Sequence, residues 1–126
     1  MPYLIAIALA TLTCLIGYIL PFYKAQDLYG ILLVMIAGSY IGFGVTDGRQ
    51  HNLVLEMIMA LVFCAMVLLG MWKWPILIVY GFFLQVVWHL LHYPLKLVSR
   101  VRTWYPLAGA IYAGMVGAFI YFHLFR

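Results

Sequence analysis

Charged residues are scarce in this sequence. Only 8% of its 126 residues are charged and 68% are hydrophobic, whereas an ordinary soluble domain is about 25% charged and about 45–50% apolar. A chain this short exposes a large share of its area when folded, so it cannot hide that much apolar surface from water. The composition excludes an ordinary soluble domain and predicts an integral membrane protein.

Acidic residues and cysteines are also few. The 7 Lys and Arg residues outweigh 3 Asp and Glu residues, giving a formal net charge of +4, but they stand singly between apolar runs. That distribution suits phospholipid headgroups at helix ends, so we expect membrane lipids and no nucleic acid as partners. Cys14 and Cys64 lie inside apolar runs without the spacing of a metal site or redox motif.

Five apolar runs are long enough to span a bilayer, which takes about 20 residues, with a range of about 17–25. Backbone groups in lipid must be hydrogen-bonded within the segment, which makes each run a helix. The sequence therefore predicts an all-α bundle forming one transmembrane domain over 1–126. Its helices are predicted over 3–22, 28–46, 53–71, 76–93 and 105–125, and the basic segment 95–104 is predicted to lie at the interface.

The basic residues indicate an orientation. With five spans, the N-terminus shares a membrane face with the loops around 47–52 and 96–102. That face has a slight excess of basic residues, which favours a cytoplasmic N-terminus in the cell inner membrane. The residues compared are Arg49, Lys96, Arg100 and Arg102 against Lys24, Lys73 and Arg126.

Small residues recur at four-residue spacing in two of the predicted helices. Gly38 and Gly42 form one such pair, and Ala110, Gly114 and Ala118 form a series. This spacing lets helices approach closely. It predicts close packing within the bundle, with a homo-oligomer interface as the alternative.

Polar residues of the predicted spans gather at one membrane face. Ionisable residues are costly in lipid, so each is a functional-site hypothesis. Glu56 lies one turn inside the third helix, and His89 and His92 end the fourth helix at the same face. Asp47 lies in the loop there.

The fourth predicted helix carries a polar stripe. Gln85, His89, His92 and Lys96 fall within roughly 60° of one another at 100° per residue. Glu56 and His89 each lie about 5 Å below the loop level at 1.5 Å per residue. Sides and depths together predict a ligand pocket, with Asp47 nearby. Its walls are Tyr40, Glu56, Gln85, Trp88, His89, His92 and Tyr112.

Three chemistries fit this pocket. In acid–base catalysis on a hydrophobic, lipid or isoprenoid-like ligand, Glu56 and His92 transfer a proton, with His89 as a further catalytic candidate and Gln85 and Tyr40 orienting. A metal, if present, would be held by His89, His92 and Glu56, although no metalloenzyme signature occurs. Proton-coupled transport would use Glu56 as the carrier. The sequence identifies no cofactor.

Structural roles compete with each of these assignments. His92 can complement the helix dipole at its C-terminal end, and Glu56 can do so at an N-terminal end. Gln85 can form an interhelical hydrogen bond, and Asp47 before Gly48 is typical of a turn. In that case the chain would be a structural accessory subunit of a membrane complex.

The segments around Gly38–Gly44, Glu56 and Gly81–His92 carry a family resemblance. Over roughly 28–125 the chain resembles the domain of unknown function 6010 family of small bacterial multi-pass membrane proteins. The resemblance implies architecture and no activity. Tyr40, Glu56, Trp88 and His92 match the family pattern. Gln85, His89 and Tyr93 stand where the family has His, Asp and a second His, which puts a shared metal site in doubt.

Overall fold

The computed structural model describes residues 2–93 and 104–124, and these form five α-helices. No strand occurs within those ranges, so the predicted all-α class is confirmed. The predicted interfacial segment lies outside the described residues except for Trp104, which begins a helix. The helices are α1 (Pro2–Ile19), α2 (Phe22–Asp47), α3 (Gln50–Trp72), α4 (Ile76–His92) and α5 (Trp104–Leu124).

The helices have the length and surface of a membrane bundle. Four of the described helices, α1, α2, α3 and α5, are long and apolar enough to cross a membrane. Helix α4 has 17 residues, at the short end of the spanning range of about 17–25 residues. Ile19 and Leu61 are 79% and 70% exposed, whereas Glu56 and His92 are buried. Lipid suits this distribution, and length and composition confirm the prediction of a multi-pass membrane protein.

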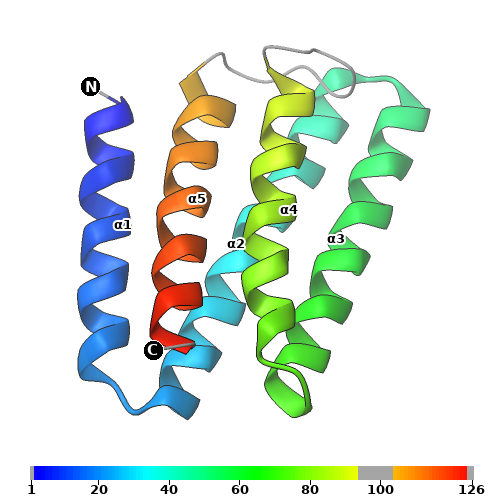
Figure 1. Cartoon of the computed structure of the whole chain (residues 1–126). Coiled ribbons are helices and arrows are strands. Elements are labelled where there is room, and N and C mark those ends of the chain that lie inside the picture. The colour runs from blue at the N-terminus through cyan, green and yellow to red at the C-terminus, as the bar shows by residue number, and fades with distance from the viewer. Residues whose placement is uncertain (1, 94–103, 125–126) are drawn as a thin grey trace.

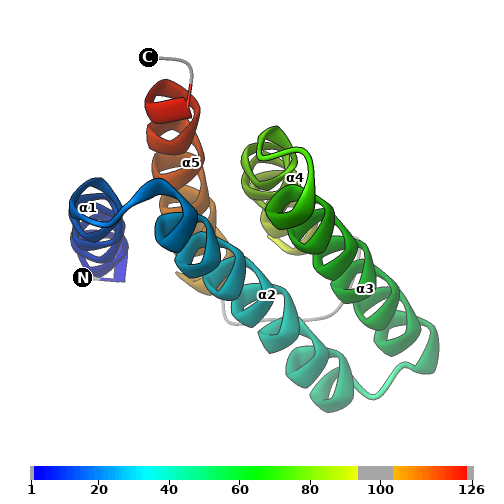
Figure 2. The same cartoon turned by 90° about the horizontal axis from the view of Figure 1, so that it is seen from below.

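The helices run antiparallel to their neighbours along the chain. Helix α5 packs between α1 and α4, and α2 packs along α3 (Figure 2). Figure 1 shows α2 crossing behind α4 and α5. The start of α1, the connection from α2 to α3, the end of α4 and the start of α5 all lie at the top of that view. The predicted polar residues at these ends therefore share one face of the bundle.

The apolar core contains residues from all five helices. Leu33, Phe82 and Val116 are each 0% exposed there. Above this core, toward the end of α4, the buried side chains become polar. The inner face of α4 continues from Phe82 through Gln85 to His89 and His92, so the same helix face carries first the core and then the site.

Helix α2 begins six residues earlier than predicted, at Phe22 instead of residue 28. The polar stretch around Lys24 and Asp27 was predicted as a loop, but it forms the first turns of α2. Pro21 stands at the N-cap with φ −55°, and Ala25 and Gln26 are buried against the bundle. Packing of that inner face stabilises the helix where hydropathy predicts its absence.

The prediction of close packing at Gly38 and Gly42 is wrong among the described residues. Both are exposed, and a Cβ added at either would meet nothing within 4 Å. Close approaches occur at other glycines. A Cβ on Gly109 would lie 2.3 Å from the His89 ring, and one on Gly44 would lie 3.3 Å from Glu56 Cγ. Two of the close glycine contacts therefore lie at the polar site.

Candidate functional site

Both carboxylate oxygens of Glu56 are hydrogen-bonded by α4. Glu56 is on the inner face of α3, with Asn52 one turn before it and Phe63 two turns after it. Its Oε1 accepts a 3.0 Å hydrogen bond from Trp88 Nε1, and its Oε2 lies 2.6 Å from His92 Nε2. Glu56 is 1% exposed and His92 2%, so the two groups meet away from water.

The His92 ring is fixed by its own helix. Its Nδ1 lies 2.7 Å from the carbonyl oxygen of Trp88. A carbonyl only accepts, so the proton must be on Nδ1. One further proton then lies between His92 Nε2 and Glu56 Oε2, bound to either atom. Both arrangements leave the pair with no net charge, which lowers the cost of burying it.

Tyr40 and His89 complete this group. The Tyr40 hydroxyl is hydrogen-bonded to His89 Nδ1. The Tyr40 ring stacks on His92, with centroids 4.0 Å apart and planes at 30°. We call the five residues the Glu56 cluster: Tyr40, Glu56, Trp88, His89 and His92. Three helices contribute to it, α2, α3 and α4.

Gly109 of α5 has no side chain, and the His89 ring packs in the space that this leaves. A Cβ at this position would lie 2.3 Å from Cε1 and 2.6 Å from Nε2 of His89. The ring therefore occupies the volume that any other residue would fill. His89 Nε2 is buried and has no hydrogen-bond partner among the described residues.

Three predicted site residues lie outside the Glu56 cluster. Gln85 is 0% exposed, and its amide has no hydrogen-bond partner among the described residues. Asp47 accepts hydrogen bonds from Arg49 at 2.8 and 3.0 Å and from Asn52 at 3.1 Å. Tyr112 is hydrogen-bonded to Thr13 of α1 at 2.8 Å. The single pocket predicted around all of these residues is thus divided in space.

The geometry does not assemble the predicted metal ligands. No group of three or more His, Cys, Asp or Glu side chains in the described ranges is placed to hold a metal ion. Both ring nitrogens of His92 are already engaged, one by Trp88 and one by Glu56. His89 keeps only its Nε2 for a further partner. The arrangement suits proton transfer better than metal binding.

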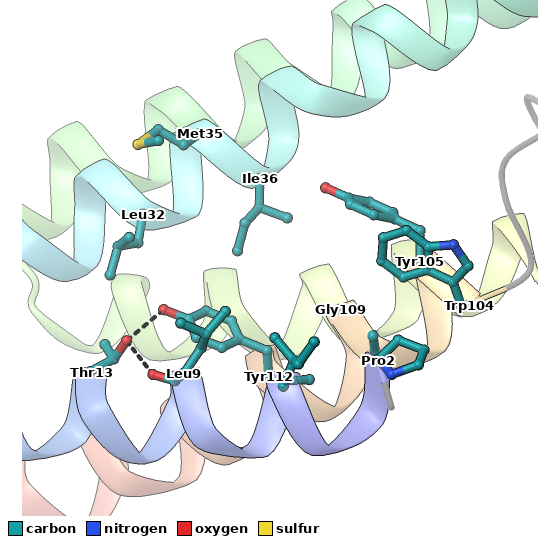
Figure 3. Close-up of a pocket in the computed structure, with 13 residues that line it drawn as sticks. Pro2, Leu9, Thr13, Leu32, Met35, Ile36, Trp104, Tyr105, Gly109 and Tyr112 are labelled. Carbon is teal, nitrogen blue, oxygen red and sulfur yellow. Dashed lines mark hydrogen bonds between the residues drawn. The ribbon is translucent and has the colours of Figure 1, made fainter.

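A cavity of about 440 Å³ lies beside the Glu56 cluster, between α1, α2 and α5. Volumes of roughly 300–1,000 Å³ are typical of small-molecule sites. We call it the α1/α2/α5 groove. Figure 3 shows Leu9 and Thr13 of α1 opposite Leu32 of α2, with Tyr112 on the floor. Tyr105 and Trp104 stand at the end where α5 begins.

The groove and the Glu56 cluster are separated by aromatic rings. Tyr105 lines the groove and packs edge-on against Tyr40, with centroids 5.5 Å apart. Tyr40 in turn stacks on His92. Gly109, which also lines the groove, contacts the His89 ring. Two aromatic rings, Tyr105 and Tyr40, therefore lie between a ligand-sized space and the Glu56–His92 pair.

Sequence reasoning missed Thr13, Tyr105 and Gly109 as site residues. Thr13 lies in an apolar run, and Tyr105 is one of many aromatic residues near helix ends. Their importance arises only because α1 and α5 are brought together. No spacing within either helix would have identified them.

Similarity to known proteins does not identify the chemistry of this site. No protein-family model, no curated protein and no solved structure matches the chain. The resemblance to the domain of unknown function 6010 family therefore stays a prediction, and the function is argued from the site itself.

Proposed function

We propose that this chain is a small enzyme of the cell inner membrane that carries out acid–base chemistry on a hydrophobic, lipid-like ligand. Glu56 and His92 are its proton-transfer pair. The observation that carries the proposal is the 2.6 Å contact between Glu56 Oε2 and His92 Nε2, with His92 Nδ1 held by the Trp88 carbonyl; such a contact requires a shared proton. A positioned carboxyl and imidazole are the usual groups of general acid–base catalysis.

The cost of the pair in lipid supports a role beyond packing. Ionisable groups within membrane spans are rare and are generally associated with proton, ion or ligand chemistry. Glu56 is also the sole acid on the inner face of α3. Apolar residues at both positions would fill the same space without the burial penalty, because replacing a whole buried ion pair by apolar residues is often neutral or stabilising.

The groove gives the pair a route to its ligand. A hydrophobic molecule would enter the α1/α2/α5 groove from the bilayer and lie against Tyr105. Tyr105 and Tyr40 are the two rings between the groove and His92, so displacement of these two side chains would bring ligand and pair together. The pair would donate its shared proton, leaving a carboxylate and a neutral imidazole, and would then be reprotonated from the nearby membrane face.

Glu56→Gln tests this function without breaking the fold. The amide oxygen can still accept from Trp88, and the amide nitrogen can donate to His92 Nε2, but no transferable proton remains. We expect a change in membrane lipid composition in cells producing the wild-type chain, measured by mass spectrometry, and none with Glu56→Gln. Asp27→Asn is the matched control, because it makes the same change at an exposed acid.

Two results would contradict the enzyme. One is an identical lipid profile for Glu56→Gln and wild type at equal amounts of folded protein. The other is a pH-gradient-driven flux in proteoliposomes that Glu56→Gln abolishes while the lipids stay unchanged, which would indicate a proton-coupled transporter.

Orientation is a separate part of the proposal. With the N-terminus cytoplasmic, the Glu56 cluster lies near the cytoplasmic face, where protons are readily exchanged. A cysteine introduced at Gly48, in the exposed connection between α2 and α3, should then react with a membrane-impermeant thiol reagent only in inverted vesicles. Reaction in intact cells would reverse the assignment.

A further inference from the structure

The tyrosine on the floor of the groove has no hydrogen left to donate. Thr13 donates its hydroxyl hydrogen to the Leu9 carbonyl, 2.8 Å away. Because a hydroxyl has one hydrogen, Thr13 must accept the 2.8 Å hydrogen bond that joins it to Tyr112. The Tyr112 hydroxyl therefore donates to Thr13 and offers the groove only lone pairs (Figure 3).

The tyrosine nearer the membrane face is arranged in the same way. Ser39 donates to the Ile36 carbonyl at 2.6 Å, so the 2.5 Å hydrogen bond between Ser39 and Tyr105 must be donated by Tyr105. Tyr105 and Tyr112 are seven residues apart on α5, which puts them on one side of the helix about 10 Å apart. Both phenols that line the groove are acceptors.

The rest of the lining excludes charge. None of the described residues around the groove is charged, and most are aliphatic, such as Ile5, Leu32 and Met35. An ionised ligand would lie in an apolar site without a counter-charge, at a high desolvation cost. Among the lining residues that the structure describes, one has a side-chain N–H, Trp104 at the first residue of α5.

We infer that the α1/α2/α5 groove binds a neutral, long-chain alcohol whose hydroxyl donates a hydrogen bond to Tyr105. The chain of the alcohol lies along the aliphatic wall toward Tyr112. This inference deepens the proposed function, on which it rests for the ligand's fate, because Tyr105 packs directly on Tyr40 of the Glu56 cluster. The ligand's reactive oxygen would then be separated from the proton-transfer pair by the Tyr40 ring.

Selectivity for a hydrogen-bond donor is the measurable consequence. We would add dodecanol, its methyl ether and dodecanoate to the full-length chain in detergent and count retained molecules by native mass spectrometry. The ether has the same chain and oxygen but no donor. Dodecanol should bind about fivefold or more tightly than the ether, the value of one hydrogen bond, and dodecanoate more weakly than dodecanol. Equal retention of alcohol and ether would show a groove for any apolar chain and would overturn the inference.

Ser39→Ala changes the preference without touching the lining. With Ser39 absent, the Tyr105 hydrogen is free to donate into the groove, so the ether and the carboxylate should bind better and the preference for alcohol should fall. Thr46→Ala is the matched control, because Thr46 bonds the Phe43 carbonyl in the same helix and no phenol. A preference that Ser39→Ala leaves at the Thr46→Ala value would also overturn the inference.

Failure of this inference differs from failure of the proposed enzyme. Glu56→Gln leaves Tyr105, Ser39 and Thr13 in place, so dodecanol should keep its preference over the ether in that variant. If the preference for alcohol holds but the lipid profiles of Glu56→Gln and wild type are identical, the alcohol site is supported and the proposed enzyme is contradicted. If the lipids change but the preference is absent, the enzyme stands and its ligand is not an alcohol.

Discussion

The Glu56 cluster and the α1/α2/α5 groove lie side by side but differ in burial and in the polarity of their side chains. In the Glu56 cluster, ionisable groups are sealed from solvent, and the Glu56 carboxylate and the His92 ring find partners on every polar atom. In the groove the lining is apolar, the space is open, and the phenols keep unused acceptor capacity. The difference teaches that two aromatic rings, Tyr40 and Tyr105, are enough to separate a buried acid–histidine pair from an open apolar space in this small bundle.

The largest expected effect comes from removing the acid at the centre of the Glu56 cluster. Glu56→Leu leaves the Trp88 N–H and His92 Nε2 without their partner, and we expect a loss of about 3 kcal/mol in the free energy of unfolding. Glu56→Gln keeps both hydrogen bonds and should lose less than about 1 kcal/mol. Denaturation in mixed detergent micelles, followed by circular dichroism, measures both. Equal stability of the two variants would contradict the assigned bonds.

The next effect concerns the glycine that stands between the two regions. Gly109→Ala places a methyl group 2.3 Å from the buried His89 ring, and overpacking of this kind costs about 2 kcal/mol. Gly38→Ala is the control, since nothing lies within 4 Å of its Cβ; it should stabilise α2 by up to about 1 kcal/mol. Opposite signs in the same denaturation assay are expected. Two variants of equal stability would show that α4 and α5 are not so closely packed.

A smaller effect is expected at the dividing ring. Tyr40→Phe keeps the stacking on His92 but removes the hydrogen bond to His89 Nδ1, which should cost about 1 kcal/mol. Tyr29→Phe, in the same helix, removes a buried hydroxyl that has no partner among the described residues and should be neutral or stabilising. The ¹⁵N shifts of His89 should move in Tyr40→Phe and stay in place in Tyr29→Phe. Unchanged ¹⁵N shifts of His89 in both variants would contradict the hydrogen bond between Tyr40 and His89.

The smallest effect lies at the same membrane face but outside both regions. Arg49 pairs with Asp47, and its guanidinium side chain is 51% exposed. The hydrogen bond to Asp47 raises the pKa of Arg49, so Arg49 stays cationic at any practical pH. The Asp47 side chain is 0% exposed, and Asn52 also donates to it at 3.1 Å. Because salt screens the exposed guanidinium, Arg49→Gln should lower the unfolding midpoint only slightly in high salt. A large shift of the unfolding midpoint in high salt would contradict this prediction and would show that the Arg49–Asp47 pair contributes strongly to stability.

Much of the Glu56 cluster could be predicted from the sequence. The spacing of Gln85, His89 and His92 puts them on one face of a helix, and counting residues from the loop puts Glu56 at a matching depth. Both arguments use only the helical repeat and the cost of charge in lipid, which are local properties. Glu56 and His92 do meet, at 2.6 Å.

The groove could not be predicted in this way. It requires α1, α2 and α5 to surround one space, and Tyr112 to turn toward Thr13, which is 99 residues away along the chain. Lipid-facing and helix-facing apolar residues look alike in a membrane sequence, because lipid tails are as apolar as leucine. Hydropathy therefore does not specify which helices are neighbours.

The sequence by itself determined the solvent, the helices and the polar face. Its apolar runs require lipid, and the period of the helix orders the polar side chains of α4. Tertiary structure alone decided that His92 turns its Nδ1 to the Trp88 carbonyl, that Tyr40 stands between pair and groove, and that Gly109 admits His89. The physical reason is that hydrogen-bond direction and steric fit depend on atoms from different helices, whose lateral order is fixed only by packing.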